Sequence, residues 1–234
     1  MKIEIWSDIA CPWCYIGKRR FESALAQFEH RDQVEIIWRS FELAPDAALK
    51  TEGSMEEVVA KKYGLSREQA AESNRTITQL AAKEGLEYHL DQIQMTNTFD
   101  AHRLIHLAAH HGLQDVAKER LLKAYFVEAR NVGEIDTLVQ LASEIGLDAE
   151  EARTALSSDT YADAVRTDEE RAHVFGITGV PFFAIDEKYG ISGAQPTDVF
   201  SRALKQSWTE SHPLVAFGDV SVGAGTCTDD SCAI

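Results

Sequence analysis

The sequence predicts an α/β fold that is interrupted by a large α-helical insertion. Two stretches carry this prediction: a strand–helix–strand order at the N-terminal end, and a strand pair followed by a helix near the C-terminal end. These elements are expected over residues 2–6, 15–28 and 34–39, and then over 180–185, 189–192 and 196–208. With 234 residues, the chain is long enough to bury a core without disulfide bonds to staple it.

The N-terminal elements follow from the spacing of apolar residues. Lys2 to Trp6 alternates as a strand does, and a second strand-like run extends from Val34 to Arg39. Between them, apolar residues recur at helical spacing, at Phe21, Ala24, Leu25 and Phe28. A strand, a helix and a second strand in this order indicate a β-α-β unit.

The middle of the chain shows helical signals only. Ser54-Met-Glu-Glu57 and Ser66-Arg-Glu-Gln69 both fit the capping box that begins a helix. Further helices are expected over about 98–111, 116–129 and 136–145, and another from Asp148 onward. Thr160 to Phe175 is expected to lead the chain back to the α/β frame.

The frame resumes after Gly176. Val180 to Ile185 and Tyr189 to Ser192 predict two antiparallel strands, and Pro196 to Trp208 carries one apolar helical face. We therefore expect residues 1–52 and 158–212 to form the two parts of one α/β domain, residues 53–157 to form the insertion, and residues 213–234 to form a flexible tail.

Composition restricts the partners and the compartment. The chain has 38 acidic and 23 basic residues, a net charge of −15, which argues against nucleic acid and anionic membranes as partners. No segment has the apolar length that a membrane span needs, and the N-terminus does not read as a signal peptide. We expect a cytoplasmic protein that acts on protein thiols or disulfides, or on small thiols.

Residues 11–14 read Cys11-Pro12-Trp13-Cys14, directly after the first predicted strand and ahead of the first helix. Unpaired N–H groups and the helix dipole at a helix start favour a thiolate, so Cys11 is the expected nucleophile, with a lowered pKa. Cys14, one turn further on, is placed to resolve a mixed disulfide formed at Cys11. Half of a zinc site or a structural disulfide are the alternatives, but zinc would need a second ligand pair.

The chain resembles the DsbA-like thioredoxin fold, and specifically its FrnE-type branch of thiol-disulfide oxidoreductases, over about residues 1–210. The resemblance rests on three motifs: Ser7-Asp8-Ile-Ala-Cys11-Pro-Trp-Cys14-Tyr15-Ile-Gly17, Asn97-Thr98 with Ala101-His102-Arg103-Leu104, and Thr178-Gly-Val-Pro181-Phe-Phe183. It implies a thioredoxin-like fold (DsbA-like) in which Pro181 is cis and lies beside the cysteines. It also implies that Asn97, Thr98, His102 and Arg103 line a substrate groove.

The pair Val180-Pro181 fits that expectation on physical grounds. A cis bond costs only about 1 kcal/mol before proline, so Pro181 can present the backbone of Val180 to a substrate peptide beside Cys11. An ordinary edge-strand proline is the alternative.

Three polar residues have two interpretations each. Asp8 is either an N-cap or turn residue, or a carboxylate that influences the protonation of the cysteines. His102 recurs with His106 and His110 at every fourth residue, but no Cys or carboxylate spacing completes a metal site, so no metal is expected. Arg103 supplies a positive charge to a thiolate or substrate carboxylate, or makes a structural ion pair.

These features together predict a dithiol-disulfide oxidoreductase or isomerase that needs no organic cofactor, with glutathione as a plausible redox partner. One alternative is a glutathione-dependent isomerase or transferase of the kappa-class and 2-hydroxychromene-2-carboxylate isomerase type, although those relatives typically have serine at the position of Cys11. A holdase-like protein-binding module is the other. In the tail, Cys227 and Cys232 either exchange with the Cys11–Cys14 pair or are incidental, metal-scavenging thiols.

Overall fold

The computed structural model describes residues 1–50 and 55–213. Its sheet has four strands in the order β2-β1-β3-β4. β1 pairs in parallel with β2, whereas β1 and β3, and β3 and β4, pair antiparallel. The strands are β1 (Lys2–Ser7), β2 (Glu35–Ser40), β3 (Phe182–Ile185) and β4 (Tyr189–Ser192). The predicted α/β frame with its antiparallel hairpin is therefore confirmed.

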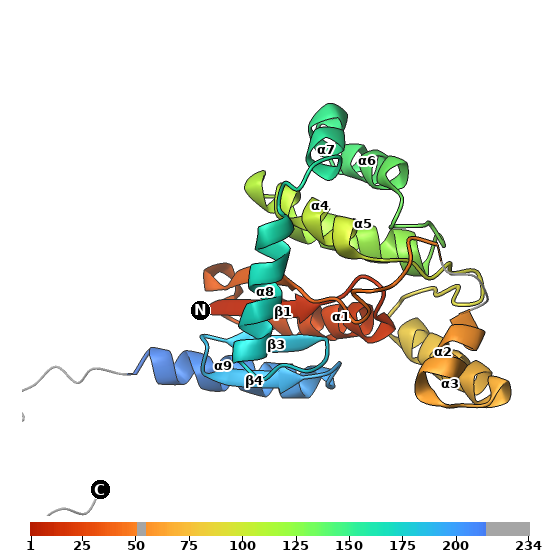
Figure 1. Cartoon of the computed structure of the whole chain (residues 1–234). Helices are drawn as coiled ribbons and strands as arrows, with labels where there is room; N and C mark the ends of the chain where they lie inside the picture. Colours follow the sequence, from red (N-terminus) through yellow and green to blue (C-terminus); the bar gives the residue numbers. More distant parts are fainter. Residues whose placement is uncertain (51–54, 214–234) are drawn as a thin grey trace, which may run out of the picture.

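Helices cover both faces of this sheet (Figure 1). On one face, Ile5 and its strand partner Phe183 pack in the core, where the Phe183 ring contacts Phe21 of α1 (Pro12–Ala26) and Phe200 of α9 (Thr197–Ser211). On the other face, Trp6 packs against Ala172 of α8 (Ala162–Val174). Side chains of successive strand residues point to opposite faces, which is why the alternating β1 sequence has apolar partners on both sides.

Seven helices lie between β2 and β3 in the described residues. They are α2 (Met55–Tyr63), α3 (Arg67–Lys83), α4 (Phe99–His110), α5 (Gln114–Phe126), α6 (Ile135–Glu144), α7 (Ala149–Leu156) and α8. The predicted capping box of Ser66 is present, and the Asp148 side chain caps α7. Ser54 of the other predicted box lies outside the described residues.

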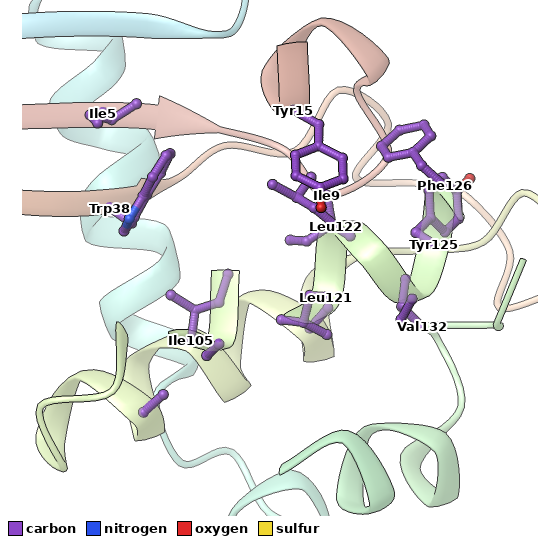
Figure 2. Close-up of a cluster of buried hydrophobic side chains, with 14 of the residues drawn as sticks. Ile5, Ile9, Tyr15, Trp38, Ile105, Leu121, Leu122, Tyr125, Phe126 and Val132 are labelled. Atoms are coloured by element: carbon purple, nitrogen blue, oxygen red, sulfur yellow. The ribbon is translucent and has the colours of Figure 1, made fainter. Parts of the chain in front are cut away.

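An apolar core joins α5 to the sheet and to α1 (Figure 2). Leu121, Leu122 and Tyr125 of α5 belong to the same buried cluster as Ile9 and Tyr15, which flank the cysteine motif. All five side chains are at most 2% exposed. Because buried apolar packing resists relative displacement, this core fixes α5 against the end of β1 and the start of α1.

Buried polar contacts attach α8 to the strands. The Asp168 carboxylate accepts hydrogen bonds from Arg39 (2.9 Å) and from the backbone N–H of Ser40 (2.9 Å). The Asp168 carbonyl accepts one from the Trp6 indole (2.9 Å). The segment expected to lead back to the frame is thus a helix, and its buried Asp168 is hydrogen-bonded to β1 and β2.

Candidate active site

The two cysteines lie in the first turn of α1. Cys11 is the N-cap, with an extended backbone (φ −95°, ψ 111°), and Pro12 is the first helical residue. The helix therefore begins three residues before the expected Tyr15, because proline at this position is pre-shaped for a helix and its missing N–H leaves no hydrogen bond unmade. This geometry brings both thiols to the positive end of the helix dipole.

Both thiols are free and shielded from water. Cys11 is 4% exposed and Cys14 is 1% exposed. The Cys11 thiol donates a hydrogen bond to the Val180 carbonyl oxygen, 3.5 Å from its sulfur. The side chain of Trp13, by contrast, is 37% exposed, so the motif has its tryptophan at the surface and its sulfurs beneath. Cys11 is the outer and Cys14 the inner thiol.

The electrostatic surroundings differ between the two sulfurs. A hydrogen bond with Cys14, together with burial, raises the pKa of the Cys11 thiol. Burial also raises the pKa of the Cys14 thiol, but the Cys11 hydrogen bond, the Lys118 ammonium and Ser7 outweigh it, so that this pKa is lowered. The lowered pKa is thus that of Cys14 and the raised one that of Cys11, which differs from the expectation that Cys11 has the lowered pKa; because the two thiols interact, they titrate as a pair.

The Val180–Pro181 bond is cis, the isomer that the resemblance implied. Val180 lies beside Cys11 through the thiol–carbonyl contact, and the Pro181 carbonyl accepts a hydrogen bond from the N–H of Gly193 (2.8 Å). On the side of α1, Gly17 packs on the proline ring, and a Cβ at Gly17 would lie only 2.9 Å from Pro181 Cγ.

Asp8 is a buried turn residue behind the cysteines and not the N-cap of α1. Its carboxylate accepts hydrogen bonds from the N–H of Leu43 (2.8 Å) and of Ala10 (3.3 Å), and it lies 3.5 Å from Nε2 of His102. Burial raises the pKa of Asp8, but His102 and these hydrogen bonds more than offset it and lower the pKa. The carboxylate is therefore ionised, and its charge contributes to the raised pKa of Cys11.

The four residues expected to line a substrate groove differ in their surroundings. Asn97 donates from its side chain to the Pro45 carbonyl (2.9 Å) and holds that loop. Thr98 and His102 are 4% and 1% exposed, so both are covered by protein. They belong to the start of α4, whose inward face packs in the core, and their place is behind the cysteines.

The expectation that Arg103 supplies charge to the thiolate is wrong. Its guanidinium donates to Asp100 (2.7 Å) and to the carbonyls of Leu156 (3.2 Å) and Thr160 (2.9 Å), with further bonds to Ala155 and Ser158. The alternative of a structural ion pair describes it. The last carbonyls of a helix have no partner within it, and the five N–H donors of a guanidinium suit several of them at once, which explains why arginine stands at the end of α7.

The sequence-based prediction did not include two residues that lie at the site, Tyr88 and Lys118. The Tyr88 hydroxyl donates to the Pro12 carbonyl (2.7 Å), and its ring stacks between Tyr15 and Phe126. Lys118 of α5 is 1% exposed and donates to the Ser7 carbonyl (3.1 Å). A signal for Lys118 existed, because it stands one turn before Leu122 in an apolar stripe, where a lysine is out of pattern.

The comparisons with known proteins agree with this fold. Residues 2–205 match the DSBA-like thioredoxin domain, and the chain belongs to this family. A relative from Bacillus subtilis (strain 168), called YwbO, is 32% identical over 204 residues, which are 86% of this chain and 94% of that protein.

Two solved structures are similar over most of the chain. The crystal structure of a probable DsbA oxidoreductase from Streptomyces coelicolor has 46% sequence identity and a TM-score of 0.87, covering 100% of this chain and 99% of the other. The cytosolic disulfide reductase DsbM from Pseudomonas aeruginosa, solved with GSH, has 16% identity and a TM-score of 0.63, covering 89% and 99%. The second similarity shows the fold alone. Among the described helices, none is both long and apolar enough to cross a membrane.

Proposed function

We propose that this protein is a thiol-disulfide oxidoreductase or isomerase of the FrnE type, with Cys11 and Cys14 as its redox centre. The observation that carries the proposal is the pair of free thiols in the first turn of α1, with the outer one against the Val180 carbonyl. Pro12, Trp13, Val180, Pro181 and Asp8 support the pair in this proposal. Membership of the DSBA-like family and the similarity to the Streptomyces structure support it further.

The exchange proceeds through a mixed disulfide. In the reducing direction, Cys11 attacks a substrate disulfide as a thiolate, one substrate sulfur leaves, and Cys14 then displaces the second by attacking the Cys11 sulfur. The substrate gains two electrons and two protons while the cysteine pair becomes a disulfide. The oxidising direction reverses these steps. Isomerisation needs only the attack by Cys11 and release of the substrate before Cys14 reacts.

Protein thiols and disulfides, or small thiols such as glutathione, are the proposed substrates, and the cytoplasm is the proposed compartment. A net charge of −15 disfavours polyanions as partners. A CxxC pair in a reducing compartment is suited to transient, catalytic disulfides. The proposed chemistry needs no organic cofactor, because the sulfurs themselves carry the electrons.

The small-molecule isomerase or transferase remains the first alternative function. That chemistry uses bound glutathione as its thiol and has no need of a second protein thiol, whereas here Cys14 lies one turn from Cys11. For the holdase alternative, alkylating Cys11 would leave the capture of unfolded chains unchanged.

The test compares Cys11→Ser and Cys14→Ser in insulin reduction and in refolding of a reduced, disulfide-containing protein. We expect Cys11→Ser to abolish both activities. Cys14→Ser should still attack and should accumulate a mixed disulfide at Cys11, visible by mass spectrometry. Wild-type turnover by Cys11→Ser would overturn the proposal. The equilibrium of the wild-type pair with glutathione then gives its reduction potential and its preferred direction.

A further inference from the structure

A cavity lies between α3 and the chain segment that follows this helix. Its volume is about 390 Å³, which falls in the range of small-ligand sites. Asn74, Thr78 and Gln79 contribute to its lining from α3, and Tyr88 and Leu90 contribute from the following segment. Figure 1 shows α3 with α2 at one side of the molecule, next to α1. None of the described lining residues belongs to the cysteine motif or to the cis-proline segment.

Tyr88 connects this cavity to the redox motif. Its ring is 5% exposed and stacks on Tyr15 and Phe126, while its hydroxyl donates to the Pro12 carbonyl oxygen (2.7 Å). The same side chain therefore lines the cavity and contacts the backbone between the two cysteines. The cavity thus lies one tyrosine side chain away from the motif.

The end of α3 is fixed to α1 by an ion pair. Glu84, the C-cap residue of α3, accepts a hydrogen bond from the guanidinium of Arg20 in α1 (2.6 Å). The same guanidinium donates to the Ala194 carbonyl (2.7 Å). These contacts hold the helix that lines the cavity against the helix that begins with the cysteine motif.

Asn74 is out of pattern in α3. It is 9% exposed and stands in line with Ala70, Ile77 and Ala81 on the buried face of the helix, where an apolar residue is expected. Asparagine also has a lower helix propensity than alanine or leucine. Nothing in the described part of the chain forms a hydrogen bond with its carboxamide, and the residue lines the cavity. Because buried polar groups are generally hydrogen-bonded, this carboxamide indicates a partner that enters the cavity.

The lining favours a neutral ligand with several hydrogen-bonding groups. Thr78 adds a hydroxyl and Gln79 a second carboxamide beside that of Asn74. The guanidinium of Arg75, which also lines the cavity, is already bound to Glu72 (3.0 Å). Phosphate and carboxylate ligands are bound most strongly by cations free to pair with them, so an anion is disfavoured. A carboxamide carries the same donor and acceptor as a backbone peptide group and can pair with both of its polar atoms.

We propose that this cavity binds a short segment of a polypeptide substrate, with the Asn74 carboxamide paired to a backbone peptide group of that segment. The inference rests on the proposed function and deepens it, because it selects polypeptides over small thiols as the substrates of Cys11. An extended chain advances about 3.5 Å per residue, so a few residues beyond the reacting cysteine reach past a single side chain such as Tyr88. Ala71 and Leu90 offer an apolar contact to a side chain of the segment. Binding is non-covalent and leaves the thiol–disulfide exchange itself unchanged.

The kinetic test compares Asn74→Leu with Thr76→Leu as its matched control. Thr76 lies in the same helix, is exposed and is not among the described lining residues. The substrates are a peptide disulfide with several residues on each side of its cysteine, and hydroxyethyl disulfide, which has no peptide group. We expect the KM for the peptide to rise about threefold to tenfold in Asn74→Leu, the effect of one lost hydrogen bond, with kcat near the wild-type value. The preference for the peptide over hydroxyethyl disulfide, as a ratio of kcat/KM, should fall by the same factor.

Thr76→Leu should keep the wild-type preference. An unchanged preference in Asn74→Leu would overturn the inference, as would equal losses in the two leucine variants. Urea unfolding separates binding from a structural role: leucine is the better helix former and no hydrogen bond within the described residues is lost, so the midpoint should stay at or above that of the wild type. A lowered midpoint with wild-type preference would make Asn74 structural and overturn the inference. If Asn74→Leu does not fold, Asn74→Asp keeps the shape of the side chain but removes its N–H donors, and it should lower the preference likewise.

Photo-crosslinking shows where the peptide binds and needs no turnover. The probe is a cysteine-free peptide that carries a benzophenone group, and the protein is the full chain with Cys11→Ser and Cys14→Ser. We expect crosslinks within α3 and residues 88–91, and fewer of them when Asn74→Leu is added. Crosslinks confined to other parts of the chain would overturn the inference. Failure of the proposed function looks different, since the wild type would then turn over neither disulfide while crosslinks at the cavity persisted.

Discussion

Gly17 lies against the ring of Pro181, so closely that a Cβ at Gly17 would stand 2.9 Å from Pro181 Cγ. Such a separation is too short for two carbon atoms without displacement of one of them. Glycine at position 17 therefore permits the close approach of two segments. One is helix α1, which carries the cysteines, and the other is Val180–Pro181. This contact connects two motifs that are more than 160 residues apart in the sequence.

Gly17→Ala is therefore expected to move Pro181 away from the cysteines. We expect a loss of about 1–3 kcal/mol in the free energy of unfolding from overpacking, and a several-fold slower thiol–disulfide exchange because Val180 shifts relative to Cys11. Urea unfolding and insulin reduction measure the two effects. Gly179→Ala is the control, because a Cβ at that position meets nothing within 4 Å, and its stability should match that of the wild type.

The thiol pair should titrate in two separate steps. The hydrogen bond with Cys14 raises the pKa of Cys11, while Cys11, Lys118 and Ser7 together lower that of Cys14 against the effect of burial. We expect one step below and one above the ordinary thiol value of 9.0 in the thiolate absorbance of the reduced protein. Two overlapping steps near 9.0 would contradict the shared-proton arrangement of Cys11 and Cys14.

Local signals were enough to predict most of the fold. The Ser66 capping box, the Asp148 N-cap and the alternation of Lys2 to Trp6 each depend on neighbours in the sequence, and each is present in the structure. The strand order β2-β1-β3-β4 was not predicted, because strand pairing depends on contacts between residues far apart in the chain.

In the site, too, features that depend on neighbours in the sequence could be predicted, and features that depend on tertiary contacts could not. The placement of Cys11 and Cys14 at a helix start follows from a strand, a proline and a helical run in succession. The direction in which Arg103 points does not, since it depends on which carbonyls α7 leaves unpaired. Lys118 reaches the Ser7 carbonyl from another helix, and only tertiary packing brings the two together.

Tyr88→Phe tests how much the hydrogen bond between Tyr88 and the cysteine motif contributes to stability. The Tyr88 hydroxyl is the donor to the Pro12 carbonyl (2.7 Å), and phenylalanine removes this donor. We expect a loss of about 1–2 kcal/mol in the free energy of unfolding, since the ring and its stacking on Phe126 remain. Thermal and urea unfolding provide the measurement, and an unchanged stability would show that the bond contributes nothing.

Cys227 and Cys232 lie outside the described residues, and their role stays a prediction from the sequence. If this pair exchanges with Cys11–Cys14, the double variant Cys227→Ser/Cys232→Ser should leave the first turnover intact and change the rate at which the active pair recovers. Stopped-flow turnover and mass spectrometry of tail disulfides follow the two phases. Wild-type recovery with no disulfide between Cys11 and the tail would mean that these thiols are incidental.

Acid stability should depend strongly on Glu4, a carboxylate in the middle of β1 that is 1% exposed. Burial raises its pKa, but hydrogen bonds from Arg171 (2.9 Å) and Arg39 (2.6 Å), and the nearby Lys2, outweigh burial and bring the pKa to about 2, from an ordinary value of 4.5.

Because this pKa is lower in the folded than in the unfolded chain, the stabilisation is fully present above about pH 4.5 and is lost as the pH falls toward 2. The shift corresponds to about 3 kcal/mol. Urea unfolding between pH 2 and 7 should show this loss in the wild type and a flatter profile in Glu4→Gln. Glu187→Gln is the control: Glu187 also pairs with Arg171 and Lys2, but its side chain is 49% exposed, so its removal should leave the profile nearly unchanged. If both variants behave alike, the surface charges and not Glu4 determine the acid sensitivity.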